Sequence, residues 1–173
     1  ASLLSRALLM PQAIAATQSN AVNSRPNILF ILMDDMGWMD TGVYGSKFYE
    51  TPNIDALAAR GMRFTDAHAA NPLCSPTRAS IMTGKYPSKL YHTDWFGAPQ
   101  PWNYQNHWTR NKPLIPAEYS PNLALEEYTL AEAFKDAGYK TFFAGKWHLG
   151  EKEEYWPEQQ GFDINIGGNS RGA

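Results

Sequence analysis

The fold class is indicated by one apolar run, Asn27-Ile28-Leu29-Phe30-Ile31-Leu32-Met33, which ends in the two carboxylates of Asp34 and Asp35. A continuous apolar run with β-branched members is typical of a central strand buried on both faces of a parallel sheet. Two adjacent carboxylates cannot both face a core, so we expect the strand to end there. The run predicts an α/β protein whose first buried strand ends beside two acidic groups.

Strand and helix patterns alternate along the chain. Thr51-Pro52 opens a predicted helix, and a short strand is predicted at 62–65. A capping box, Thr129-Leu130-Ala131-Glu132, opens a later helix that Gly138 ends, and the next strand is predicted at 139–144. This alternation predicts a doubly wound α/β fold, a mostly parallel sheet with helices on both faces, left incomplete at the C-terminus of this chain.

Three polar residues follow predicted strands: Asp34, Asp35 and Lys146. In doubly wound folds, sites form beyond the C-terminal ends of the strands. Adjacent carboxylates repel unless a positive charge lies beside them, and a hard divalent cation with oxygen ligands would supply it. A solvated turn, in which one aspartate caps a backbone N–H, is the simpler interpretation of the pair taken alone.

The single cysteine lies in Leu73-Cys74-Ser75-Pro76-Thr77-Arg78, at the mouth of a predicted helix. Pro76 suits the first helical position, and Ser75 can cap the helix. Cys74 would then face the positive end of the helix, with Arg78 one turn further on. The segment therefore predicts a site for an anionic group.

A cysteine taken alone is more often a small buried apolar residue than a nucleophile. As a thiolate at a helix N-terminus Cys74 could be reactive, which makes a cysteine phosphatase the obvious rival. That rival needs a longer loop between cysteine and arginine, so that backbone N–H groups can surround a phosphate. The intervening Ser75-Pro76-Thr77 is too short for this.

The run from Cys74 to Arg78 resembles the CxPxR signature of the type I, formylglycine-dependent sulfatases, and Thr83-Gly84 resembles its extension. Two further segments agree with this family in the expected order: 27–37 upstream, and Gly145-Lys146-Trp147-His148-Leu149-Gly150 downstream. The resemblance extends from about Arg25 to the end of the chain. It implies the N-terminal part, 25–173, of a sulfuric ester hydrolase domain in the alkaline phosphatase superfamily.

The resemblance implies that a maturation enzyme oxidises Cys74 to formylglycine. The hydrated aldehyde would carry two hydroxyls: one, deprotonated beside the cation, attacks sulfur, and the other then loses its proton, which expels sulfate and regenerates the aldehyde. The cation implied is calcium, with magnesium as the other possibility, bound by Asp34, Asp35 and the modified residue 74. A later Asp and Asn of the family pattern have no counterpart in this chain.

Lys146 and His148 are two residues apart on a predicted extended segment, so their side chains should project to the same side. By resemblance, Lys146 binds sulfate, His148 contacts the hydroxyl or sulfate oxygens, and Arg78 orients residue 74. Without the resemblance, Lys146 and His148 would be interpreted as surface residues around a half-buried Trp147.

Ser170 is a further candidate for contact with sulfate, and Asn169 competes with it for that role. His68 and His92 are expected to be structural or to line the site.

The composition is that of a globular protein: 173 residues, 43% hydrophobic and 13% aromatic, with a formal net charge of -2. No basic stripe is present, so we expect no nucleic-acid partner. The single cysteine excludes an internal disulfide.

The N-terminus predicts the compartment. Arg6 precedes an interrupted apolar stretch, 7–16, followed by polar residues. We interpret 1–22 as the remnant of a secretory signal, with a disordered leader as the alternative. The stretch is too short to span a bilayer, so the expectation is a secreted or periplasmic protein without stable membrane insertion.

Residues 87–121 show no sustained period and are rich in aromatic side chains, among them Trp95, Trp102, Tyr104 and Trp108. These could stack on sugar rings at the rim of a pocket. The simpler interpretation is that a long irregular loop needs aromatic residues to pack onto its domain.

The sequence leaves more than one substrate and more than one activity open. As substrates, sulfate esters of carbohydrates are favoured over aryl sulfates. One alternative function is that of a phosphomonoester or phosphonate ester hydrolase of the same superfamily. The other is that of a truncated chain that binds a ligand without catalysis. The piece 1–173 alone is expected to be inactive, because calcium usually takes about six to eight ligands and few are visible here.

Overall fold

The computed structural model describes residues 25–171, and the chain divides into two units after Asp35. In the first unit, residues 27–33 carry exposed apolar side chains, with Leu29 84% and Ile31 68% exposed. No strand partner for this segment exists among the described residues. The prediction of a strand buried on both faces is therefore not met, because burial requires neighbouring strands and covering helices that the described residues do not supply.

The second unit begins with a small hydrogen-bonded substructure. A 3₁₀ turn, η1 (Gly42–Tyr44), precedes helix α1 (Pro52–Arg60), which confirms the helix predicted from Thr51-Pro52. The Asp55 carboxylate accepts a hydrogen bond from Val43 N at 2.7 Å and so ties the helix to the turn. The strand predicted at 62–65 does not form, since these residues are exposed and pair with no described strand.

Helix α2 (Cys74–Thr83) starts two residues earlier than predicted, with Leu73 at the N-cap and Gly84 in the left-handed conformation at the C-cap. Ser75 is inside the first turn and does not cap the helix, so the predicted cap is wrong. Pro76 is tolerated there because the first N–H groups of a helix need no intrahelical partner. This shift frees the Ser75 hydroxyl for contacts far away in the sequence.

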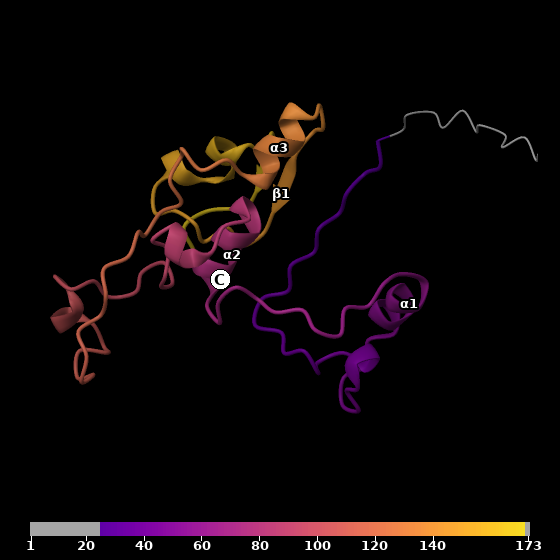
Figure 1. The fold of residues 1–173 in the computed structure, drawn as a ribbon, viewed down its shortest axis with the longest axis horizontal. Helices are drawn as coiled ribbons and strands as arrows, with labels where there is room; N and C mark the ends of the chain where they lie inside the picture. The colour runs from indigo at the N-terminus through magenta and orange to yellow at the C-terminus, as the bar shows by residue number, and fades with distance from the viewer. Residues whose placement is uncertain (1–24, 172–173) are drawn as a thin grey trace, which may run out of the picture. The chain divides into compact units, whose positions relative to one another are not determined.

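The α/β part of the unit consists of helix α3 (Leu130–Asp136) and two parallel strands, β1 (Phe142–Ala144) and β2 (Ile164–Ile166), in register Phe142 to Ile164. The capping box is confirmed: Glu132 N donates to Thr129 Oγ1, and Thr129 N donates to the Glu132 carboxylate. Strand β2 was not predicted. Figure 1 shows α2, α3 and β1 gathered in one body, and the parallel pair with helices confirms the α/β class.

Side chains from α2, α3 and the loops around them form the core of this body. Its most buried members are Ala79, Met82, Leu123, Ala131, Trp147 and Leu149. Trp147 is 1% exposed and packs its ring edge-on against Phe143 and Phe162, with centroids at 5.3 and 6.0 Å. The loop after β1 is thereby anchored to the core by one aromatic side chain.

The segment 87–121 is irregular, as predicted, and contains only the 3₁₀ turns η2 (Pro87–Lys89) and η3 (Tyr104–Asn106). Two more such turns, η4 (Glu153–Tyr155) and η5 (Pro157–Gln160), connect the strands. Among the residues that the structure describes, no helix has the length and apolar character needed to cross a bilayer. The predicted leader 1–22 lies outside the described residues.

Candidate active site

The first turn of α2 meets the loop that follows β1. Lys146 Nζ lies 3.3 Å from Cys74 Sγ, and Arg78 Nη1 donates a hydrogen bond to the Lys146 carbonyl at 2.5 Å. Cys74 and Lys146 are both only partly buried, so the cysteine remains accessible. The structure therefore brings together three of the predicted site residues, from positions 68 to 72 residues apart in the sequence.

Ser75 connects the same helix turn to His148. Its hydroxyl oxygen accepts a hydrogen bond from Phe96 N at 2.9 Å and lies 3.3 Å from His148 Nδ1. Because the oxygen already accepts from Phe96, and the hydroxyl has no other partner among the described residues, its proton is available for Nδ1. The hydroxyl can donate to Nδ1 in the tautomer of His148 that carries its proton on Nε2.

His148 is held in a defined orientation. It is 6% exposed, its φ of 58° lies in the left-handed region, and the Phe96 ring packs edge-on against it with centroids 5.5 Å apart. A left-handed φ at a residue other than glycine is uncommon and persists where the surroundings fix it. Sequence reasoning expected Lys146 and His148 on one extended segment; the left-handed turn differs from that, yet both side chains reach α2.

A cavity of about 490 Å³ opens beside these residues, lined by Trp95, Phe96, Gly97, Lys146, His148, Ser170 and Arg171. Ser170 therefore shares one cavity with Lys146 and His148. Its rival, Asn169, uses its backbone carbonyl to accept from His148 N at 3.3 Å and its side-chain oxygen to accept from Arg171 N at 2.8 Å. Both neighbours contribute to the site, but Ser170 is the one that lines the cavity.

Asp34 and Asp35 end the first unit, and both are exposed. Asp35 has a φ of 53°, a left-handed conformation that aspartate adopts more readily than most residues. Their carboxylate oxygens are the donors that a hard cation such as calcium prefers, so the chemistry of this pair fits the predicted metal.

Sequence reasoning missed Ser75 and Phe96 as parts of the site. Ser75 was interpreted as a helix cap, and Phe96 lies in a segment without a period. Their contact spans 21 residues, and the contact of Ser75 with His148 spans 73. No local pattern signals either contact, although the position of Ser75 beside the cysteine could have drawn attention to it.

The sulfatase family profile matches residues 26–171, most of the chain. The chain belongs to the sulfatase family. It is 40% identical over 158 residues to N-acetylgalactosamine-6-sulfatase of Canis lupus familiaris, an alignment that covers 90% of this chain and 28% of the dog enzyme. The chain thus spans little more than a quarter of the length of this relative.

Solved structures of sulfatases share the fold. The crystal structure of Ps i-CgsB is 35% identical, with a TM-score of 0.65, and the match covers 84% of this chain and 29% of that one. A second structure, Ps i-CgsB in complex with k-i-k-neocarrahexaose, gives a TM-score of 0.59 at 34% identity over 78% of this chain and 27% of that one. These neighbours confirm the predicted α/β fold class of the family.

The Ser75 contacts predict a stability effect that can be measured against a control on the same helix. Ser75→Ala should lower the free energy of unfolding by about 1–3 kcal/mol, because it leaves the Phe96 N–H and His148 Nδ1 without their partner. Ser80→Ala is the matched control, since the buried Ser80 hydroxyl makes no hydrogen bond among the described residues. We expect its effect to stay within about 0.5 kcal/mol. Equal losses in denaturant titrations of the two variants would contradict the assignment.

His92, expected to be structural or lining, is fully buried, and neither ring nitrogen has a hydrogen-bond partner among the described residues. Burial lowers the pKa of His92 from 6.5 to about 4; the backbone of Ser120 acts against this shift, and nearby His148 adds to it. The imidazole is therefore neutral in the folded protein near neutral pH.

The lowered pKa of His92 predicts a loss of stability in acid. The unfolded chain takes up the proton below about pH 6.5 and the folded chain only near pH 4, so stability is complete above 6.5 and falls by about 3 kcal/mol down to pH 4. In His92→Gln the free energy of unfolding, measured as a function of pH, should change less between pH 6.5 and pH 4. His68→Gln, a change at an exposed histidine, should keep the slope. If His92→Gln keeps the same slope, the pH dependence of stability arises from other titratable groups.

Proposed function

We propose that the protein hydrolyses sulfate monoesters of carbohydrates. The observation that carries the proposal is the convergence of Lys146 and His148 on Cys74 and Ser75 in the first turn of α2. A cation, an imidazole and an accessible residue at a helix N-terminus together suit an anionic group whose charge shifts during reaction. The names of the dog relative and of the oligosaccharide complex support a sugar as the alcohol part of the ester.

In this proposal Cys74 is converted to formylglycine by a maturation enzyme, and Asp34, Asp35 and residue 74 hold calcium. When present, the hydrated aldehyde and the cation supply an activated oxygen nucleophile for the sulfur atom. The remaining work belongs to the side chains around it.

Lys146 binds the sulfate oxygens as a positive point charge, since its ammonium group already lies beside residue 74. His148 lines the same cavity, and in the tautomer that accepts from Ser75 at Nδ1 its Nε2–H donates to an ester or sulfate oxygen and stabilises charge there. Ser170 contributes a further hydroxyl to the same cavity. Arg78 positions the loop through the Lys146 carbonyl, so its role is to fix where the ammonium group stands.

We propose, further, a leader at 1–22, the N-terminal part of the catalytic domain at 25–173, and a secreted or periplasmic location. The support is the pattern of the leader in the sequence together with the family match that begins at residue 26.

The formylglycine proposal predicts a specific mass change. Protein from a host with the maturation machinery should carry, in the peptide that contains residue 74, the mass of an aldehyde in place of a thiol. The complete sulfatase domain that contains this chain should release sulfate from sulfated galactose or N-acetylgalactosamine faster than phosphate from the matching phosphate esters. Cys74→Ala should lose at least about a thousandfold in kcat, as expected for removal of a covalent nucleophile. An unmodified cysteine in fully active protein would refute the proposal, and preference for the phosphate esters would favour a phosphoryl hydrolase.

The metal proposal predicts a matched loss for the two aspartates. Asp34→Asn and Asp35→Asn each replace a charged oxygen ligand by a neutral one, so each should weaken calcium binding in equilibrium dialysis and reduce turnover. Asp40→Asn, a change at an aspartate five positions along the chain whose carboxylate accepts from Gly37 N at 2.7 Å, is the control and should retain both calcium binding and turnover. Calcium content unchanged in both aspartate variants would indicate a solvated turn.

A further inference from the structure

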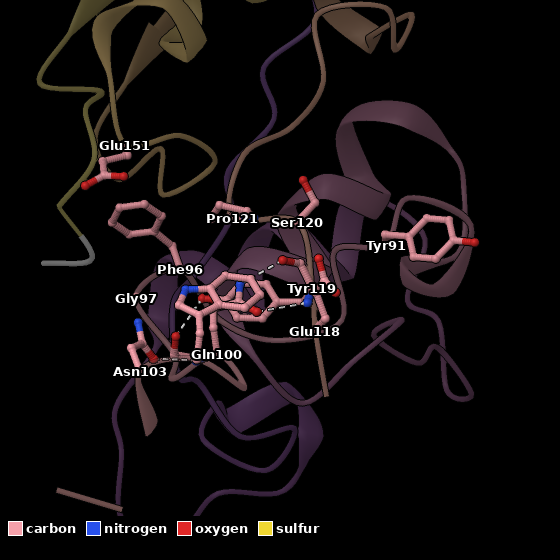
Figure 2. A pocket seen from close by; sticks show the side chains of 12 residues that line it. Tyr91, Phe96, Gly97, Gln100, Asn103, Glu118, Tyr119, Ser120, Pro121 and Glu151 are labelled. Carbon is pink, nitrogen blue, oxygen red and sulfur yellow. Dashed lines mark hydrogen bonds between the residues drawn. The ribbon is translucent and has the colours of Figure 1, made fainter. Parts of the chain in front are cut away.

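A second, larger cavity of about 780 Å³ lies next to the candidate site, formed by the irregular segment 91–103 together with 118–121 and Glu151. Figure 2 shows Phe96 and Glu151 at one end of it and Tyr91 at the other, with Gln100 and Tyr119 between them. Trp102, 68% exposed, also lines this space. The cavity has no role in the chemistry described above.

The floor of this cavity is fixed by buried hydrogen bonds. Gln100 Nε2 donates to the Tyr119 carbonyl at 2.8 Å, and Tyr119 N donates back to Gln100 Oε1 at 3.2 Å. The Tyr119 hydroxyl donates to the Ala98 carbonyl at 2.9 Å. Gln100 and Tyr119 are 6% and 4% exposed, so these bonds are shielded from water. The cavity is therefore largely preformed, which lowers the ordering cost of binding a ligand.

The larger cavity shares part of its wall with the smaller one. Phe96 and Gly97 line both, and Phe96 N is bonded to Ser75 in the first turn of α2. A side chain at Gly97 would be strained, because its φ is 88° and an added Cβ would meet the Trp95 ring at 3.1 Å. A molecule whose anionic end contacts Lys146 and His148 therefore lies beside the larger cavity, separated from it by no more than the shared wall at Phe96 and Gly97.

The two cavities differ in charge. Lys146 and Arg171 line the smaller one, whereas the larger one has the carboxylates of Glu118 and Glu151 and no lysine or arginine among its lining residues. Neither carboxylate makes a hydrogen bond or ion pair with the described residues, so both can accept from ligand hydroxyl groups. Asn103 uses its side-chain oxygen on Gln100 N and keeps its amide N–H groups for a ligand.

We propose that this larger cavity is a subsite for an uncharged sugar ring linked to the sulfated one. The proposal rests on the proposed sulfatase function and adds a substrate class to it. Trp102 supplies an aromatic face for the apolar side of the ring, Glu118 and Glu151 accept from its hydroxyl groups, and Asn103 donates to them. The same carboxylates repel a second sulfate, so the subsite selects against sulfation of the neighbouring ring.

The test compares three substrates in the matured, complete sulfatase domain that contains this chain. The first is the sulfated monosaccharide that is hydrolysed fastest among the 4- and 6-sulfates of galactose and N-acetylgalactosamine. The second is a disaccharide of that ring with an uncharged sugar, and the third is the same disaccharide with sulfate on both rings. We expect the kcat/KM of the disaccharide with one sulfate to exceed that of the monosaccharide by about tenfold, as one aromatic contact allows. The kcat/KM of the doubly sulfated disaccharide should be lower than that of the disaccharide with one sulfate.

Variants assign this gain to the cavity. Trp102→Ala should abolish the advantage of the disaccharide and leave hydrolysis of the monosaccharide unchanged. Trp108→Ala is the matched control, since Trp108 is similarly exposed, at 76%, and lines neither cavity. Replacing Glu118 and Glu151 together by Gln should improve the doubly sulfated substrate about two- to fivefold at low salt, and less at high salt.

Several results would overturn the subsite. Equal rates on the monosaccharide and the disaccharide would do so, and so would a preference for the doubly sulfated substrate. A loss of activity in Trp102→Ala that is shared by all three substrates would also do so, because it would indicate that the cavity holds part of the protein itself. Absence of hydrolysis of every sulfate ester would refute the sulfatase function instead. Calorimetric titration of the Cys74→Ala protein with the uncharged disaccharide then still decides about the cavity: binding that Trp102→Ala removes supports it, and no binding at millimolar concentration refutes it.

Discussion

The contact between the first turn of α2 and the loop after β1 is the constraint on which the second unit depends. Trp147 occupies the core between Phe143 and Phe162, and its indole N–H donates to the Tyr155 carbonyl at 2.9 Å. Because that side chain points inward, the residues on either side of it, Lys146 and His148, are turned towards the helix. A single buried aromatic residue thereby helps to position the two polar side chains beside it in the sequence.

The helix contributes the other half of this constraint. Its second residue, Ser75, is fully buried and uses both hydrogen-bonding functions of its hydroxyl, one towards Phe96 and one towards His148. The irregular segment is thus joined to the helix turn and to the loop after β1 at the same atom. A long loop without secondary structure can hold a defined wall only through such side-chain bonds, and the Gln100–Tyr119 pair serves the same purpose further along.

The sequence predicted those parts of the structure that local signals determine. The helix after Thr51, the capping box at Thr129 and the strand ending at Ala144 follow from residues within a few positions of one another, and all three are present. The parallel α/β class followed from their order. By contrast, strand β2, with only three residues, is defined by its pairing with β1 and not by a pattern of its own.

The residues of the site also fall into those that local motifs reveal and those that only distant contacts reveal. Cys74, Arg78, Lys146 and His148 were found because they lie in short motifs, and the structure brings the side chains of all four to one helix turn or its adjoining loop. Ser75 could not be assigned correctly, since a serine before a proline near a helix start is an ordinary cap, and only a partner 73 residues away gives it another role.

The exposed run 27–33 shows where sequence and structure differ for a physical reason. Its side chains have the composition of a doubly buried strand, yet Leu29, Phe30 and Ile31 are all more than 60% exposed, and the backbone pairs with no described strand. Exposed apolar side chains on an unpaired strand favour association with another strand. The aspartates at its end are exposed with it, and two carboxylates are fewer oxygen ligands than the six to eight or so that calcium usually takes. Burial of the strand and completion of the metal shell would therefore require the same thing, neighbours for this segment beyond those that the described residues provide.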